Sequence, residues 1–174
     1  MYQPREDSFL LARQVEKYAK NKKVLDIGTG TSIQAETALK AGAKEVIASD
    51  IDINVIKHLK NKGIKFIQSD LFSNIIGNFD LIIFNPPYLP KDKSEDLESR
   101  KTTTGGKKGD EILLRFLEQV SSHLERDGVV LLIISSLTPK EKIFSLLKKL
   151  SFKYNVLNSK SFFFETLEVW EIKK

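Results

Sequence analysis

The chain has 174 residues, of which 41% are apolar and 29% are charged, and its formal net charge is +5. This composition fits one globular domain, contains no apolar run near the ~20 residues that cross a bilayer, and, because cysteine is absent, excludes disulfides and thiolate chemistry. The positive charge leaves two interpretations open: an acidic or nucleic-acid partner, or a lysine-rich solubilising surface with 23 acidic residues interspersed.

Helical and strand patterns alternate along the whole chain. The predicted helices span residues 7–20, 33–41, 53–62, 110–124 and 139–150. The predicted strands span residues 24–27, 45–49, 64–68, 79–84, 128–135, 152–157 and 167–172. This alternation predicts an α/β fold with a mostly parallel seven-stranded sheet, helices on both faces and a C-terminal antiparallel hairpin.

Residues 1–174 are predicted to form a single domain, because no linker, internal repeat or low-complexity tract divides the chain. Residues 1–20 supply its N-terminal helix. The polar stretch 90–108 holds many charged residues, three threonines and two adjacent glycines. We expect a mobile substrate loop there, because the stretch is longer than a connector needs to be.

A glycine-containing loop, "VLDIGTGTS" (residues 24–32), joins the first predicted strand to a helix. Gly28 and Gly30 allow a tight turn and a close approach of the backbone to a ligand. The helix that follows offers free N–H groups and the positive end of its dipole. Ser32 stands near the place of the third glycine in the dinucleotide fingerprint, so the loop is a weak dinucleotide signal.

Three acids, Asp26, Asp50 and Asp70, fall at the ends of three successive predicted strands. Each alone is an ordinary turn or cap residue, but together they line the carboxyl edge of the sheet, where α/β folds bind ligands. Asp50 follows Gly30 at the spacing of about 20 residues that suits an acid binding ribose hydroxyls. Such an edge repels phosphate and favours a cofactor with a sulfonium, an amino group and a ribose, which predicts S-adenosylmethionine.

The fourth predicted strand ends abruptly in Asn85-Pro86-Pro87-Tyr88. The Asn85 side chain and the Pro86 backbone each offer a fixed carbonyl oxygen, and two such acceptors hold both hydrogens of a planar NH₂ group. This grip favours pyramidalisation of the nitrogen, points its lone pair at a methyl donor and stabilises the positive charge that develops. Tyr88 can pack its ring on a flat substrate. The alternative is a rigid Pro-Pro turn without chemistry.

The motifs "DIGTGTS", "SDID", "SDLF" and "NPPY" resemble those of Rossmann-like class I methyltransferases that act on exocyclic or amide nitrogen. "YQPREDSFLL", "GGKKGDEILLRFL" and "ETLEVWEI" are similar to the short HemK-related protein-glutamine methyltransferases of archaea and eukaryotes. The resemblance covers nearly the whole chain. It implies methylation of the glutamine in the Gly-Gly-Gln motif of a class 1 peptide-release factor.

The resemblance also implies roles for individual residues. The cofactor-binding set would be Ser8, Asp26, Gly28, Gly30, Asp50, Asp70, Leu71 and Asn85. Within it, Ser8 and the glycine loop would hold the methionine part, beneath a lid within residues 1–20 that is shaped by Pro4, Glu6 and Asp7. Asp50 would bind the ribose, and Asp70 would meet the adenine amino group, with Leu71 against the ring.

The implied catalytic set is Asn85, Pro86, Pro87 and Tyr88, of which Asn85, Pro86 and Tyr88 would bind the substrate. Residues 105–109 would flank the substrate entrance, although they also read as a flexible stretch before a helix. A rival function is adenine-N6 methylation of DNA or RNA, because the same two acceptors suit the adenine amino group. That reaction usually needs extra recognition surface to extract the base, and the basic residues here are scattered. A third reading, a cofactor-binding module without catalysis, conflicts with the intact motif.

By the same resemblance, a small zinc-binding activator subunit would add a strand to an edge of the sheet, with residues 64–68 as the candidate strand. Ile64 and Phe66 share one face of that strand, which either awaits a partner or packs on a helix of the same chain. His58 and His123 stand apart without a metal-ligand pattern, so no metal site is predicted. The N-terminus lacks the apolar core of a secretion signal, and we expect a cytoplasmic protein without a membrane or nucleic-acid partner.

Overall fold

The structure is a computed structural model that describes residues 4–58, 63–88 and 105–174. Its helices are α1 (Glu6–Tyr18), α2 (Ile33–Lys40), α3 (Ile53–His58), α5 (Glu111–Val120) and α6 (Glu141–Lys149). Its strands are β1 (Lys23–Ile27), β2 (Glu45–Asp50), β3 (Lys65–Gln68), β4 (Phe79–Phe84), β5 (Leu124–Ser135), β6 (Lys153–Ser161) and β7 (Thr166–Lys173). None of the described helices combines the length and the apolar character needed to cross a membrane.

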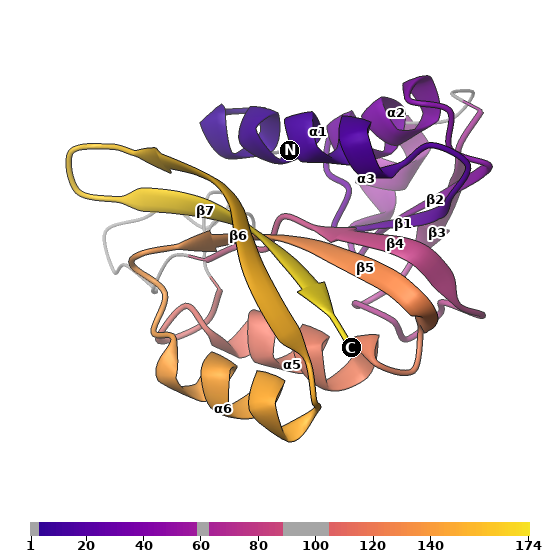
Figure 1. Ribbon diagram of the computed structural model, residues 1–174. Coiled ribbons are helices and arrows are strands. Elements are labelled where there is room, and N and C mark those ends of the chain that lie inside the picture. Colours follow the sequence, from indigo (N-terminus) through magenta and orange to yellow (C-terminus); the bar gives the residue numbers. More distant parts are fainter. Residues whose placement is uncertain (1–3, 59–62, 89–104) are drawn as a thin grey trace.

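The strands form one seven-stranded sheet in the order β3-β2-β1-β4-β5-β7-β6. Strands β1 to β5 pair in parallel, and β7 and β6 complete the sheet as an antiparallel hairpin. Helices α1, α2 and α3 cover one face, and α5 and α6 cover the other (Figure 1). The predicted fold class is therefore confirmed.

Strand β4 lies in the middle of the sheet and packs on both faces. Leu81 and Ile83 join the apolar cluster beneath α1 and α2. Ile82 and Phe84 join the cluster that α5 and α6 cover. A strand buried on both faces reads as a continuous apolar run, and residues 81–84 form such a run in the sequence.

A polar contact attaches helix α1 to β7, a strand near one end of the sheet. The Tyr18 hydroxyl donates to Glu171 Oε1 on β7 at 2.8 Å, across 153 positions of the chain. Burial and the neighbouring Glu171 carboxylate raise the pKa of Tyr18 to about 12, so the hydroxyl stays a donor. This contact fixes the helix whose first turn reaches the carboxyl edge.

Three predicted boundaries are wrong. Strand β5 begins at Leu124 rather than at residue 128, because Leu124 already pairs with Phe79 before a register shift restarts the pairing at Leu81 and Val129. The preceding helix α5 ends at Val120 and not at residue 124, because Leu124 already belongs to β5. Strand β6 runs to Ser161, past the predicted end at residue 157, because its pairing with β7 continues to Thr166.

Two predicted features lie partly outside the described residues. The predicted helix 53–62 is seen as α3, and its last residues, 59–62, are not described. Of the predicted substrate loop 90–108, residues 105–108 are described.

Candidate active site

The carboxyl ends of β3, β2, β1 and β4 meet at one edge of the sheet, because these four neighbours are parallel. Ile27, the last residue of β1, pairs with Phe84, the last residue of β4. The glycine loop and the Asn-Pro-Pro-Tyr motif therefore begin side by side, with Gly28 level with Asn85. This adjacency is what the sequence reasoning required of the two motifs.

The glycine loop adopts the left-handed backbone conformation that glycine accepts without strain. Gly28 has φ +63° and Gly30 has φ +51°. A Cβ atom added at Gly30 would meet no atom within 4 Å, so the loop presents an open backbone face. Ser32, at the place where a third glycine was expected, also has positive φ (67°) and begins α2.

Asp26 braces this loop from below. Its buried carboxylate accepts hydrogen bonds from Thr29 Oγ1 at 2.7 Å and from the Ala35 backbone N–H at 3.2 Å. Burial raises the pKa of Asp26 to about 7, against the lowering effect of these hydrogen bonds and with a further rise from the Asp50 charge. Asp26 thus ties both sides of the loop together and titrates near neutral pH.

Asp50, the last residue of β2, holds the loop from the side. Its Oδ2 accepts from the Gly30 N–H at 3.0 Å, and its Oδ1 accepts from the Asp52 N–H at 3.0 Å. The structure thus brings Asp26 and Asp50 to the glycine loop, as the sequence pattern predicted. Both carboxylates lie close to the open backbone face at Gly30.

Asp70 lies further along the edge and does not end a strand. Strand β3 stops at Gln68, and Asp70 begins the turn that follows, in which the Ser73 N–H donates to the Asp70 carbonyl. The Asp70 carboxylate forms an ion pair with Arg115 of α5 at 2.8 Å, and both side chains are about half exposed. Leu71 is buried in the core beneath this turn.

Asn85 is held in one orientation by Asp7, an acid near the N-terminus of the chain. Its Nδ2 donates to Asp7 Oδ2 at 3.0 Å, while Asp7 Oδ1 accepts from the Ser8 N–H at 2.7 Å. Because the carboxylate accepts from the amide nitrogen, Asn85 Oδ1 must point the other way. That oxygen is buried and has no hydrogen-bond partner among the described residues. A fixed, unsatisfied acceptor is what a substrate NH₂ group requires.

The first turn of α1 connects the glycine loop to this amide. Gln34 Nε2, near the start of α2, donates to the Ser8 backbone carbonyl at 2.9 Å. Asp7 and Ser8 are both buried, so the turn closes over the edge. The sequence analysis gave Asp7 only a share in a lid and missed Gln34. The contact with Asn85 spans 78 positions and leaves no local sequence signal.

Residues 105–109 pack directly against the Asn-Pro-Pro-Tyr motif. A Cβ atom on the buried Gly105 would lie within 3.0 Å of the Pro87 and Gly109 carbonyl oxygens, so only glycine fits there. On the other side, Thr138 Oγ1 donates to the Tyr88 carbonyl at 3.3 Å. Asp110, which the sequence analysis did not single out, is buried with its Oδ1 unpartnered among the described residues.

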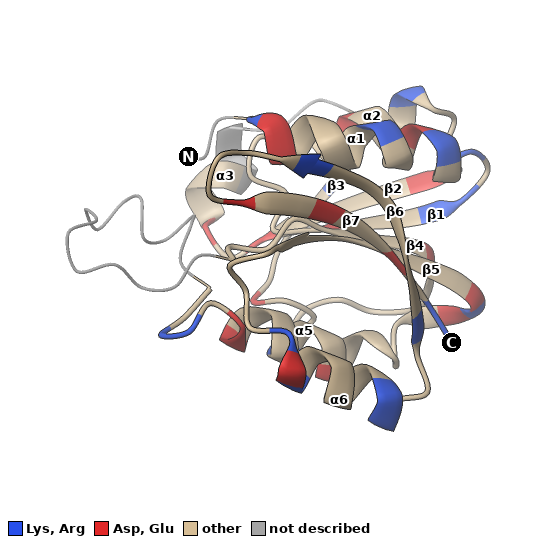
Figure 2. Cartoon of the chain, turned by 60° about the vertical axis from the view of Figure 1, so that its left-hand side comes forward, with Lys and Arg blue, Asp and Glu red and all other residues tan. Residues whose placement is uncertain are grey.

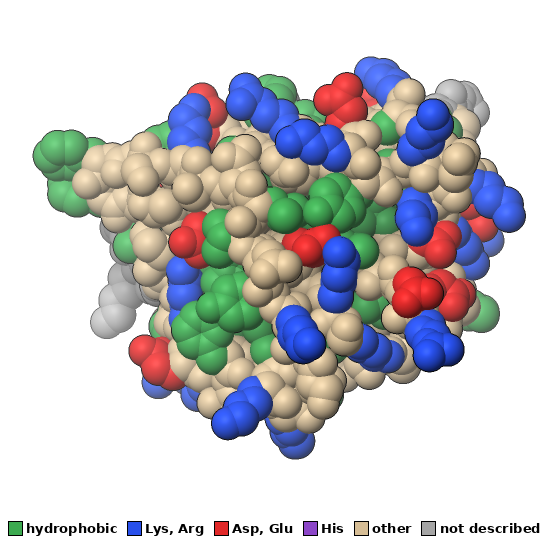
Figure 3. All heavy atoms as spheres, viewed as in Figure 1, with side chains coloured by type: hydrophobic (Ala, Val, Ile, Leu, Met, Phe, Trp, Pro, Cys, Tyr) green, Lys and Arg blue, Asp and Glu red, His purple; other side chains and the backbone are tan. Residues whose placement is uncertain are grey.

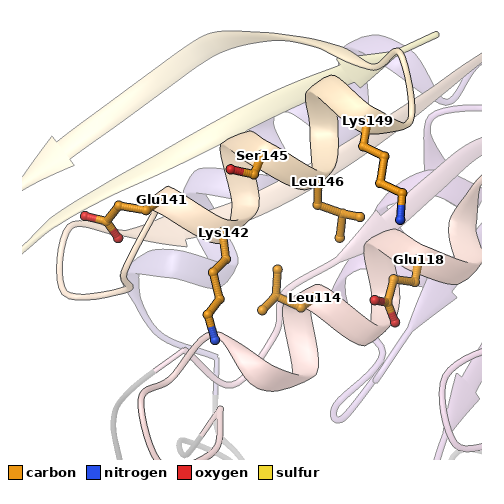
Figure 4. A pocket seen from close by; sticks show the side chains of 7 residues that line it. All are labelled: Leu114, Glu118, Glu141, Lys142, Ser145, Leu146 and Lys149. Carbon is orange, nitrogen blue, oxygen red and sulfur yellow. The ribbon is translucent and has the colours of Figure 1, made fainter.

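A separate groove lies between α5 and α6 (Figure 4). It has a volume of about 420 Å³ and an apolar floor of Leu114 and Leu146. Charged side chains from both helices form its rim: Glu118, Glu141, Lys142 and Lys149. None of the predicted site residues lines this groove.

The topology and the strand-edge site together define a class I methyltransferase, with a glycine loop after the first strand and an amide motif after the fourth. Comparison with known proteins narrows this class. The profile of the methyltransferase small domain family matches residues 6–164.

Two relatives and one solved structure are among the proteins that align along most of the chain. A protein of Methanocaldococcus jannaschii, predicted to be a protein N5-glutamine methyltransferase, is 41% identical over 164 residues, which cover 90% of this chain and 83% of the relative. The eRF1 methyltransferase catalytic subunit mtq2 of Schizosaccharomyces pombe is 28% identical, covering 99% of this chain and 88% of its own. The E. cuniculi Mtq2–Trm112 complex, responsible for methylation of the eRF1 translation termination factor, matches at a TM-score of 0.80 and 24% identity, covering 99% and 98%.

The chain therefore belongs to the methyltransferase small domain family and, within it, to the protein N5-glutamine methyltransferases. The resemblance inferred from its sequence motifs is confirmed.

Proposed function

We propose that the protein transfers the methyl group of S-adenosylmethionine to the side-chain amide nitrogen of a protein glutamine, in the Gly-Gly-Gln motif of a class 1 release factor. One observation carries the proposal: Asn85 Oδ1 is buried, unpartnered among the described residues, and fixed by Asp7 level with the glycine loop. An orphaned acceptor in that position needs a donor, and a substrate NH₂ supplies one. The names of the aligned relatives support the choice of glutamine.

The residues at the edge suit this cofactor. The open face at Gly30 gives room for a ligand against the backbone, and the Asp50 carboxylate beside it attracts positively charged groups of the ligand. We assign the methionine part to Ser8 and the glycine loop, and the ribose to Asp50. The adenine end falls to Asp70 and Leu71, near Arg115. When bound, S-adenosylmethionine supplies an electrophilic methyl group on sulfur.

The protein's own groups position the acceptor nitrogen. Asn85 Oδ1 and the Pro86 carbonyl accept the two hydrogens of the glutamine amide, which turns the nitrogen lone pair toward the methyl group. The two carbonyl dipoles would stabilise the positive charge that develops on this nitrogen as it takes the methyl group that the cofactor's sulfonium would supply. The methylated nitrogen then releases a proton to water, so no strong general base is required. We assign Tyr88 to the substrate side of the site; its half-buried side chain packs against the apolar cluster under α1 and α2, and its carbonyl accepts from Thr138 Oγ1.

Adenine-N6 methylation of nucleic acid remains the rival, because adenine carries a similar NH₂ group. Two observations favour the protein substrate. Two relatives that align along at least 90% of the chain are named for protein-glutamine or eRF1 methylation. Basic and acidic positions are interspersed over the described helices and strands instead of gathering into one basic face (Figure 2).

We also propose that a small activator subunit adds a strand along β3, the end strand of the sheet next to β2. The aligned E. cuniculi structure is a complex of Mtq2 with Trm112, which supports a partner subunit for this chain. Of the two alternatives for the shared face of Ile64 and Phe66, the structure supports the second. Both side chains pack into the apolar cluster under α1 and α2, so they do not await a partner. The backbone edge of β3 is the supporting feature, together with the exposed Ile51, whose carbonyl accepts from Gln68 Nε2 at 3.1 Å.

Mass spectrometry of a Gly-Gly-Gln release factor after incubation with enzyme and S-adenosylmethionine tests the proposed function. We expect one added methyl group on the motif glutamine. Parallel reactions with DNA and RNA, using a labelled methyl donor, serve as controls. Label on nucleic acid with none on the release factor would establish the rival reaction.

A further inference from the structure

The turn between β6 and β7 exposes three consecutive phenylalanines. Phe163 is 92% exposed, Phe164 is 83% exposed and Phe162 is 40% exposed. The rings of Phe163 and Phe164 meet edge to face with centroids 4.5 Å apart. They form an apolar cluster at the end of the projecting hairpin (Figure 3). Single exposed apolar residues are common, but a contiguous aromatic cluster marks an interaction site.

The turn that carries these rings is well braced. The Phe162 N–H donates to the Glu165 carbonyl at 2.6 Å, which closes the turn. Ser135 Oγ donates to Glu165 Oε1 at 2.6 Å, and Ser136 exchanges hydrogen bonds with Thr166. The phenylalanines are therefore presented on a built turn anchored to the end of β5, so little ordering entropy opposes their use in binding.

The same turn stands at the active-site edge. Strand β5 is parallel to β4, and Leu132 pairs with Phe84, directly before Asn85. The β5 chain then continues past Ser135 through the exposed Leu137 to Thr138, which contacts Tyr88. Counting residues along the strands places the phenylalanines on the order of 20 Å beyond the level of Asn85. On the other side, Lys160 pairs with Glu6, the neighbour of Asp7.

We propose that the Phe162–Phe164 turn binds the acceptor protein. Its rings would insert into an apolar pocket on the folded domain of the acceptor that carries the side chain to be methylated. The inference rests on the proposed function, since it takes the acceptor to be a protein. A glutamine side chain in the site cannot reach rings that stand about 20 Å away, whereas a folded domain spans both. Exposed aromatic rings held in place beside a functional edge are the residues that dominate protein interfaces.

The charges around the turn favour a protein over a membrane. Apolar segments that enter a lipid surface are accompanied by an excess of lysine and arginine. The described charges beside this turn are Glu165 and the paired Lys160 and Glu6, which give no such excess (Figure 2). Membrane binding is therefore left as an outcome that the test can detect.

The test compares the wild-type enzyme with a Phe163→Ser/Phe164→Ser double variant on two substrates: a full-length Gly-Gly-Gln release factor and a short peptide with the same motif. We expect KM for the release factor to rise at least about tenfold in the double variant, because exposed aromatic anchors contribute most of the affinity. The kcat at saturation, the KM for S-adenosylmethionine and kcat/KM for the peptide should stay unchanged. An Ile76→Ser variant is the matched control, since Ile76 is 88% exposed in the turn before β4, at the opposite edge.

The outcomes separate the two proposals. An unchanged KM for the release factor, or an equal loss on the protein and the peptide, would overturn the docking role and leave the proposed function standing. A wild-type enzyme that methylates neither substrate would remove both. Sedimentation of the wild type, but not of the double variant, with vesicles containing anionic lipid would assign the turn to a membrane if KM for the release factor is unchanged.

Discussion

Replacing Asp7 with Asn should abolish most of the turnover while leaving the affinity for S-adenosylmethionine unchanged. In the native protein, Asp7 accepts from Asn85 Nδ2 at 3.0 Å and from the Ser8 N–H at 2.7 Å. An asparagine at position 7 has one acceptor oxygen and one NH₂ group, so it cannot satisfy both donors. The arrangement that satisfies most groups rotates the Asn85 amide, whose oxygen then accepts from the new NH₂. The acceptor that should hold the substrate is thereby turned away.

The magnitude follows from the loss of one aimed acceptor. Removing a single preorganised hydrogen-bonding group that stabilises a transition state lowers kcat by about 10²–10³-fold. If the amide does not rotate, a buried donor is left unpaired, which costs about 1–3 kcal/mol of stability. The Asp7→Asn variant should therefore lose turnover while keeping its affinity for S-adenosylmethionine, which contacts neither oxygen of Asp7 in this account.

Three quantities are compared between the wild-type and Asp7→Asn enzymes: kcat, the affinity for S-adenosylmethionine measured by calorimetry on the same preparation, and the urea midpoint of unfolding. Glu6→Gln is the control, because Glu6 lies in the same helical turn but forms a half-exposed pair with Lys160. Such a pair contributes less than about 1 kcal/mol. An Asp7→Asn enzyme with the kcat of the Glu6→Gln enzyme would refute the positioning role of Asp7.

Two further predictions concern the edge. The pKa of Asp26 rises from 3.8 to about 7 on folding, so the folded state keeps a proton that the unfolded state releases between these values. The free energy of unfolding should therefore fall, by up to about 4 kcal/mol, as pH rises through that window. Urea titrations at pH 5 and pH 8 should show a smaller fall for Asp26→Asn than for the wild type. An equal pH dependence in the two proteins would contradict this assignment of the pKa to Asp26. Gly105→Ala should cost about 1–3 kcal/mol of stability and slow methyl transfer, because the added Cβ would press on the Pro87 carbonyl. Gly30→Ala, where the added Cβ meets no atom of the protein within 4 Å, should mainly weaken cofactor binding. Equal midpoints for Gly105→Ala and wild type would show that the 105–109 segment is free to move.

The parts of the fold that sequence reasoning predicted are those with local signals. The apolar run of β4 is unambiguous because neighbours cover both of its faces, and the glycine loop is recognisable because a sharp turn needs its residue type. The early start of β5 was missed, since residues 124–127 are mostly polar and become strand only by pairing near Phe79. Pairing of this kind depends on a neighbour that the local pattern does not contain.

The candidate site divides in the same way. Residue types at the ends of strands pointed to Asp26, Asp50 and Asn85, and topology then placed them at one edge. The contact between Asp7 and Asn85 depends on where α1 docks, which is set by tertiary contacts such as Tyr18 with Glu171. No spacing rule links residues so far apart in the chain, so the orientation of the amide became visible only in three dimensions.

In the proposed reaction, Asn85 Oδ1 accepts a hydrogen bond from the substrate NH₂. This contact can be tested by single-turnover methyl transfer to a Gly-Gly-Gln release factor, with wild-type and Asn85→Ala enzymes saturated with S-adenosylmethionine. We expect the transfer rate of the variant to fall at least about 10²-fold, with cofactor affinity nearly unchanged. A variant that transfers the methyl group at the wild-type rate would contradict it.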